Sequence, residues 1–177
     1  YIEQGKYILE LRDKRIIADH MRAIVFGIND GVIPSNEGRG YVVKKLIIDI
    51  TDIILRAGLT QSTVHKLVPA VVEAMKEPYP ELMDKANNIA GIICKIEESY
   101  IKVRQERVPE FEAQAKDIQS PEKLGDLIFT FRDTYGLTVS TIQKMLKGFH
   151  FSTEELEKAW QCFDQLMKCQ QEQSRAS

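Results

Sequence analysis

The sequence predicts an all-α protein, a helical bundle of about seven helices with a long central helix. Apolar residues recur at intervals of three and four along most of the 177-residue chain, which is the period of a helix with one buried face. No stretch has the apolar–polar alternation of a strand. Proline and glycine also stand where such helices would begin and end.

The first two predicted helices flank a Gly-rich polar loop. We expect the first helix from about Lys6 to Ile28, because apolar residues recur there at Ile17, Met21, Ile24 and Ile28. The second should run from about Tyr41 to Ala57, with Gly58 as its C-terminal cap. The second helix is rich in β-branched residues, so burial rather than helix propensity must hold it.

Prolines shape the next two predicted helices. A third helix should span about Thr63 to Met75, with a kink at Pro69, which removes one backbone hydrogen bond. The fourth and longest should run from about Glu81 to Arg107. We expect Pro109 to interrupt it, although a similar apolar stripe continues beyond the proline.

Two shorter helices should follow. Ser120 and Pro121 have the residue types of an N-cap and a first helical residue, and Gly136 should end this fifth helix. A sixth helix is expected from about Val139 to Lys147.

The last helix should open at the capping box formed by Ser152 and Glu155. The Gln/Ser-rich tail from Gln170 is expected to fray. We predict two helical subdomains, residues 1–118 and a smaller one of residues 119–177, packed on each other.

Composition excludes several functional classes. The net charge of −2 argues against a protein that coats nucleic acid electrostatically, so any RNA contact should be local. Three cysteines without metal-ligand spacing suit a reduced, cytoplasmic protein, and we expect no metal site. No apolar run approaches the ~20 residues of a membrane span. The chain opens with Tyr1 and without a signal-peptide pattern, and is interpreted as an excised segment.

No catalytic motif is evident. There is no P-loop and no nucleophile beside a partner base, so we expect no catalytic residue and no cofactor in this segment. The most distinctive stretch is the loop between the first two helices. Pro34 fixes a turn there. Glycines that permit positive φ or close approach stand at Gly31, Gly38 and Gly40. Basic residues near the next helix start are Arg39, Lys44 and Lys45.

This loop has two interpretations from its residues alone. A helix N-terminus with basic neighbours is a plausible anion cradle. A structural connection with a solvated basic rim fits the same residues, because one Gly-rich loop is a weak motif.

Four ordered segments resemble alanyl-tRNA synthetases, a class II family. Ala18-Asp19-His20-Met21-Arg22 precedes Asp30-Gly31-Val32-Ile33-Pro34-Ser35-Asn36-Glu37-Gly38-Arg39-Gly40-Tyr41-Val42 at the family's distance. Leu67-Val68-Pro69-Ala70-Val71-Val72-Glu73 with Tyr79-Pro80-Glu81-Leu82, and Asp133-Thr134-Tyr135-Gly136, follow in the same order. The resemblance covers about residues 15–177, and the ordered set is far more specific than any one match.

The resemblance implies the helical tRNA-recognition part that follows the catalytic core. The parent enzyme would attach alanine to tRNA(Ala) with ATP and Mg, whereas this segment alone would not. Its implied partners are the tRNA acceptor stem and the catalytic domain of the same chain, not DNA or a membrane. The residues that match the family's readers of the G·U wobble at the third acceptor pair are Asn36 and Asp133. Arg39, Lys44 and Lys45 would touch the RNA backbone.

Two departures from the family pattern keep an alternative open. The expected second basic pair is replaced by Ile48-Asp49, and the Phe-Pro expected after Gly136 is replaced by Leu137-Thr138. A helical protein-interaction module of a synthetase paralogue that has lost RNA recognition would also fit these changes and the near-neutral charge.

Overall fold

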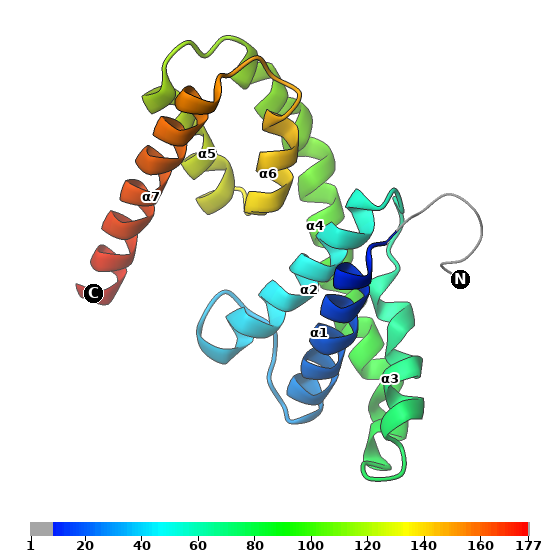
Figure 1. Cartoon of the computed structure of the whole chain (residues 1–177). Coiled ribbons are helices and arrows are strands. Elements are labelled where there is room, and N and C mark those ends of the chain that lie inside the picture. The colour runs from blue at the N-terminus through cyan, green and yellow to red at the C-terminus, as the bar shows by residue number, and fades with distance from the viewer. Residues whose placement is uncertain (1–8, 177) are drawn as a thin grey trace. The chain divides into compact units, whose positions relative to one another are not determined.

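The computed structural model describes residues 9–176, and all regular secondary structure in that range is helical (Figure 1). The all-α prediction is therefore confirmed. The helices are α1 (Leu11–Asn29), α2 (Gly38–Arg56), the short 3₁₀ helix η1 (Val64–Leu67), α3 (Val68–Met75), α4 (Glu81–Lys116), α5 (Pro121–Asp133), α6 (Val139–Leu146) and α7 (Thr153–Ala176). Within the described range no helix is both long and apolar enough to cross a bilayer.

The chain forms two compact units, each with its own core. The first unit ends at Ile101 and the second begins at Lys102, so the long helix α4 contributes to both. The sequence-based division after residue 118 follows a helix end, whereas the packing division lies inside α4. The physical reason is that Phe111 and Ala115 of α4 are buried in the second core.

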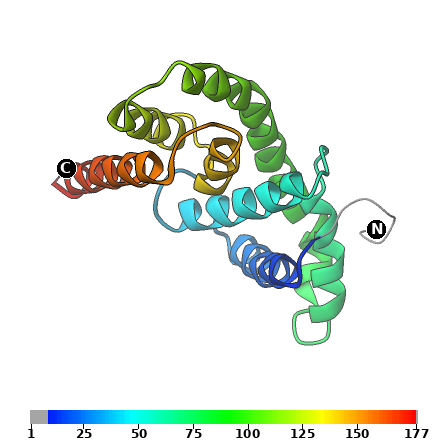
Figure 2. The ribbon, with the colours of Figure 1, turned by 45° about the horizontal axis from the view of Figure 1, so that its top comes forward.

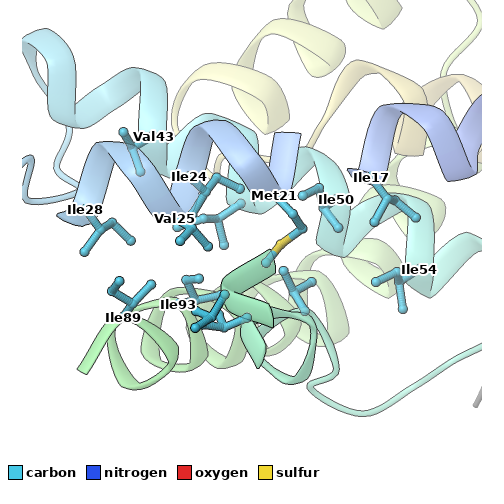
Figure 3. Close-up of a cluster of buried hydrophobic side chains, with 14 of the residues drawn as sticks. Ile17, Met21, Ile24, Val25, Ile28, Val43, Ile50, Ile54, Ile89 and Ile93 are labelled. Atoms are coloured by element: carbon cyan, nitrogen blue, oxygen red, sulfur yellow. The ribbon is translucent and has the colours of Figure 1, made fainter. Parts of the chain in front are cut away.

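The first core is built from aliphatic side chains of α1, α2, η1, α3 and the first part of α4. Figure 3 shows Val25 and Ile28 of α1 facing Ile89 and Ile93 of α4. Met21 is 1% exposed in the same cluster. Full burial of such a side chain contributes about 1.5–3 kcal/mol, so packing compensates for the β-branched composition of α2.

Two carboxylates are buried in the described part of this unit, those of Asp52 in α2 and Glu97 in α4. Glu97 of α4 is 1% exposed. Its carboxylate accepts hydrogen bonds from the backbone N–H groups of Thr63 (2.5 Å) and Val64 (2.8 Å) and from the Ser62 hydroxyl (2.7 Å). His65 Nδ1 lies 3.1 Å from the same carboxylate. Glu97 therefore caps the start of η1 across a sequence separation of more than thirty residues.

The second core centres on α5 and α7, which pack along each other (Figures 1 and 2). Phe111 and Phe131 meet edge to face, with ring centroids 5.2 Å apart. Gly125 of α5 permits the close approach of α7, since a Cβ there would lie 2.6 Å from Cys162 Cβ and 2.9 Å from the Ala159 carbonyl oxygen.

The expectations for Pro109 and Pro69 were wrong. α4 continues through Pro109 to Lys116. Proline removes one hydrogen bond from a helix, but burial of Phe111 and Ala115 on the far side holds the helix together. Pro69 does not kink a helix interior. The 3₁₀ helix ends at Leu67, so Pro69 lies in the first turn of α3, where its missing N–H has no intrahelical partner to lose.

Other helix ends differ less. The predicted start at Lys6 lies outside the described residues. α2 begins at Gly38, three residues before the predicted start at Tyr41. The tail predicted to fray from Gln170 is helical to Ala176, because α7 packs against α5 and Gln170 bonds to Asp133. The predicted caps at Ser120 and Ser152 are confirmed.

The Ser152 capping box predicts a pH dependence of stability. The Ser152 backbone N–H donates to the Glu155 carboxylate at 2.7 Å, and the Glu155 N–H donates to Ser152 Oγ at 3.2 Å. The bond from the Ser152 backbone lowers the pKa of Glu155 below its ordinary value of 4.5. A lowered folded-state pKa contributes stability above the unfolded-state pKa, and this contribution is lost as pH falls through the folded-state value. The wild type should therefore be more stable than Glu155→Gln at neutral pH, and this difference in stability should shrink on acidification from about pH 5.

Urea-denaturation midpoints measured from pH 7 to pH 3 test this expectation. Glu157→Gln on the exposed face of α7 is the matched control. The expectation would be contradicted if the stability difference between the wild type and Glu155→Gln stayed constant across the acid range. It would also be contradicted if that difference equalled the one between the wild type and Glu157→Gln at every pH.

Candidate functional site

The Gly-rich loop occupies residues 30–37 between α1 and α2, and its path is set by the end of α1. The N–H of Gly31 bonds to the Ile28 carbonyl (3.0 Å) and the N–H of Val32 to the Gly27 carbonyl (3.0 Å). This is the Schellman pattern, which needs a left-handed residue after the helix. Gly31 supplies it with φ of +88°, so the loop leaves α1 in one defined direction.

The first turn of α2 packs tightly against this loop. Gly40 is buried, and a Cβ there would lie 2.3 Å from both the Ile33 carbonyl oxygen and Ser35 Oγ. Gly38 instead has positive φ, at +54°. The N-cap residue Glu37 makes no side-chain capping bond. The first amides of α2 are therefore not covered by a capping side chain, and the helix N-terminus carries a partial positive charge.

Asn36 is exposed near the end of the loop and is held by a lysine from α2. Lys44 Nζ donates to Asn36 Oδ1 at 2.6 Å. The Asn36 NH₂ group can donate to a further partner, and the second lone pair of Oδ1 can still accept.

The remaining basic residues lie on the first two turns of α2. Arg39 is exposed. Lys45 Nζ pairs with Asp49 Oδ2 at 2.8 Å, so one of the two departures from the family pattern partly neutralises a predicted RNA contact. Exposed pairs of this kind contribute only about 0–1 kcal/mol, and Lys45 can exchange Asp49 for another anion at little cost.

Asp133 is the last residue of α5, in the second unit, and is exposed. Its Oδ1 accepts a hydrogen bond of 2.5 Å from Gln170 Nε2 of α7. The following residues are anchored separately. The Tyr135 ring packs edge-on against Phe131 at 4.9 Å, and the Arg107 guanidinium lies 4.1 Å from the centre of the Tyr135 ring.

The other departure from the family pattern is compatible with a rigid turn. Gly136 has φ of +77°, and the Leu137 side chain is fully buried in the second core. The Leu137 N–H bonds to the Phe131 carbonyl at 3.0 Å. Leucine therefore anchors the turn after Asp133 in place of the expected Phe-Pro.

The structure brings Asn36, Arg39, Lys44 and Lys45 to the start of α2, whereas Asp133 belongs to the second unit. Sequence reasoning missed Gln170 and Arg107, which contact the Asp133–Gly136 segment. The sequence did hold a signal for Gln170, because this polar residue continues the apolar stripe of α7. It held no comparable signal for Arg107. In the described part of the chain, no group of three or more His, Cys, Asp or Glu side chains is placed to hold a metal.

The family model for class II tRNA synthetases (A) matches residues 6–177, and the chain belongs to that family.

Three named relatives show which members of the family the chain is similar to. The chain is 33% identical to the alanine–tRNA ligase of Saccharophagus degradans over 168 residues, which are 95% of this chain and 19% of that protein. Identity to the Bordetella pertussis alanine–tRNA ligase is 34% over 99% of this chain and 20% of that protein. Identity to the Solibacter usitatus alanine–tRNA ligase is 37% over 92% of this chain and 18% of that protein. The chain thus spans about a fifth of these relatives, and they favour a segment of an alanyl-tRNA synthetase over the interaction-module interpretation.

Proposed function

We propose that this chain is the tRNA-recognition segment of an alanine–tRNA ligase, and that it binds the acceptor stem and reads the G·U wobble at the third pair. The observation that carries the proposal is that both candidate readers are exposed and held by a neighbouring side chain. Lys44 holds Asn36, and Gln170 holds Asp133.

The chemistry of a wobble pair suits Asp133. In A-form RNA the wide, shallow minor groove is the one open to side chains. A G·U pair leaves the guanine 2-amino group without a pairing partner in that groove. An ionised carboxylate only accepts hydrogen bonds, and one oxygen of Asp133 already accepts from Gln170. The second oxygen is the acceptor for the guanine amine.

Asn36 supports the proposal from the first unit. Lys44 holds its carbonyl oxygen, and its NH₂ group can donate to an acceptor of the RNA. A Watson–Crick pair at the same position would leave one of these polar groups without its partner. The penalty for such a mismatch is about 1–3 kcal/mol.

Contacts with the phosphates of the RNA backbone are assigned to the first part of α2. Arg39 is exposed there beside amides that no capping side chain covers, and phosphates bind favourably at such helix N-termini. Lys45 is exposed about two turns further along α2. Lys44 adds charge at the same place and at the same time orients Asn36. A few local contacts suffice, consistent with the net charge of −2.

The whole enzyme would supply the rest of the reaction. ATP and Mg would be used in a catalytic domain of the same chain, and this segment would hold the acceptor stem so that its terminal adenosine reaches that domain. We assign no catalytic residue to this segment, and we place the protein in the cytoplasm with other synthetases.

Binding to two acceptor-stem hairpins tests the proposal. The hairpins differ only in the third pair, G·U or G·C, and affinities are measured at two salt concentrations. The G·U hairpin should bind about tenfold more tightly, and Asn36→Ala or Asp133→Ala should remove the difference without changing the salt slope.

Control variants separate base reading from backbone contact. Asn88→Ala and Asp164→Ala change exposed residues of the same types on α4 and α7 and should leave the preference intact. Arg39→Ala should weaken both hairpins alike and reduce the salt slope by about one. Equal binding of the two hairpins by the wild type would refute base reading by this chain.

A further inference from the structure

We infer that Gln170 of α7 is a positioning residue for base readout, which orients the Asp133 carboxylate so that one oxygen is presented to the RNA. The inference rests on the proposed function and extends it to a residue outside the segments that carry the family resemblance. The observation behind it is the hydrogen bond of 2.5 Å from Gln170 Nε2 to Asp133 Oδ1.

Gln170 lies on the face of α7 that packs against α5. Residues Ala159, Phe163 and Met167 of that face belong to the second core or pack against it. Gln170 follows Met167 by three positions, and residues three or four apart share a helix face. A polar residue thus takes the next place on an apolar stripe, opposite the last residue of α5. Its partner there is a carboxylate, not another apolar side chain.

The end of α5 is an unfavourable place for a free carboxylate. The last carbonyl groups of a helix carry a partial negative charge, and a nearby acidic side chain is repelled. An amide donor relieves this repulsion without adding charge. Because the bond fixes one oxygen, it also limits the rotation of the side chain, so the second oxygen is presented in one direction before RNA arrives. Such preorganisation removes part of the entropy cost of binding.

Holding α5 and α7 together does not require this bond. The contact between the two helices already includes the buried side chains of Phe131 and Phe163 and the close approach at Gly125. Gln170 is half-buried at the edge of this contact. Loss of its donor should therefore affect Asp133 far more than the stability of the unit.

The test uses Gln170→Met in the 177-residue chain. Methionine keeps the length and helix propensity of glutamine but cannot donate. We expect the preference for the G·U over the G·C hairpin to fall about three- to tenfold, with G·C affinity and the thermal midpoint near wild-type values. Gln165→Met, on the exposed side of α7, is the matched control and should keep the full preference. Gln170→Lys restores a donor and should recover most of it.

A double-mutant cycle shows whether Gln170 acts through Asp133. In the Asp133→Ala background, Gln170→Met should have no further effect on the preference. An unchanged G·U preference in Gln170→Met overturns the inference and leaves the proposed function standing. A different result would also overturn the inference. If Gln170→Met binds both hairpins equally more weakly and has a lowered thermal midpoint, and Gln170→Lys restores neither, Gln170 has a purely structural role. Absence of any preference in the wild type refutes the proposed function, and the inference with it.

Discussion

Glu97→Ala is expected to destabilise the first unit by about 3–5 kcal/mol, because several buried hydrogen-bond donors lose their acceptor together. The Glu97 carboxylate is 1% exposed and is the acceptor for the backbone N–H groups of Thr63 and Val64. Alanine would leave both donors and the Ser62 hydroxyl without this partner and open a cavity beside the core. An unmade hydrogen bond of a buried donor costs about 1–3 kcal/mol, so the effects accumulate.

Chemical denaturation followed by far-UV circular dichroism measures this loss. The neighbouring Glu98→Ala is the matched control, because Glu98 is exposed and accepts only a weak bond from the Cys94 thiol at 3.5 Å. It should change stability by about 0.5 kcal/mol or less. Glu97→Gln keeps one acceptor oxygen, so its loss of stability should lie between those of Glu97→Ala and Glu98→Ala. Equal stability of Glu97→Ala and Glu98→Ala would contradict the assigned role of Glu97.

Gly40→Ala is expected to destabilise the same unit by about 1–3 kcal/mol, the usual cost of overpacking. The added methyl group would lie 2.3 Å from the Ile33 carbonyl oxygen and from Ser35 Oγ. Ser35 can rotate, but the carbonyl belongs to the backbone, so the loop must move. Asn36 lies in that loop, and the G·U preference of the hairpins should fall together with stability.

Gly91→Ala is the matched control for this change. Gly91 lies in α4, and a Cβ there would meet no atom within 4 Å. The same substitution should stabilise the protein there by up to about 1 kcal/mol, because alanine has the higher helix propensity. The two alanine variants should therefore shift the unfolding midpoint in opposite directions. A Gly40→Ala variant with wild-type stability and G·U preference would show that the loop tolerates the methyl group.

Local signals in the sequence predicted the helices well. Periodic apolar residues located all seven α-helices of residues 9–176, and the caps at Ser120 and Ser152 formed as expected. Gly58, predicted as a C-terminal cap, has φ of +100°. These features depend on neighbouring residues alone. Pro109 was misread because a local rule, that proline ends a helix, was outweighed by burial of residues beyond it.

The sequence predicted which residues belong to the candidate site but not which side chains contact them. Family resemblance singled out Asn36 and Asp133, and neither spacing nor composition indicated that Lys44 and Gln170 would hold them. Lys44 is eight residues from Asn36, two helical turns into α2, and Gln170 is 37 residues from Asp133. The tail predicted to fray is ordered for the same reason, since its packing partner lies on another helix.

The sequence by itself thus determined the helical class, the helix caps and the family. Periodicity and capping chemistry act between residues that are close together in the chain, and motif order can be read directly from the sequence. Tertiary structure decided which polar groups are buried, which glycine is required for space, and which side chains orient the candidate readers. Glu97, Gly40 and Gln170 owe their roles to partners on other segments. Only the packing of helices brings such partners within hydrogen-bonding or van der Waals distance.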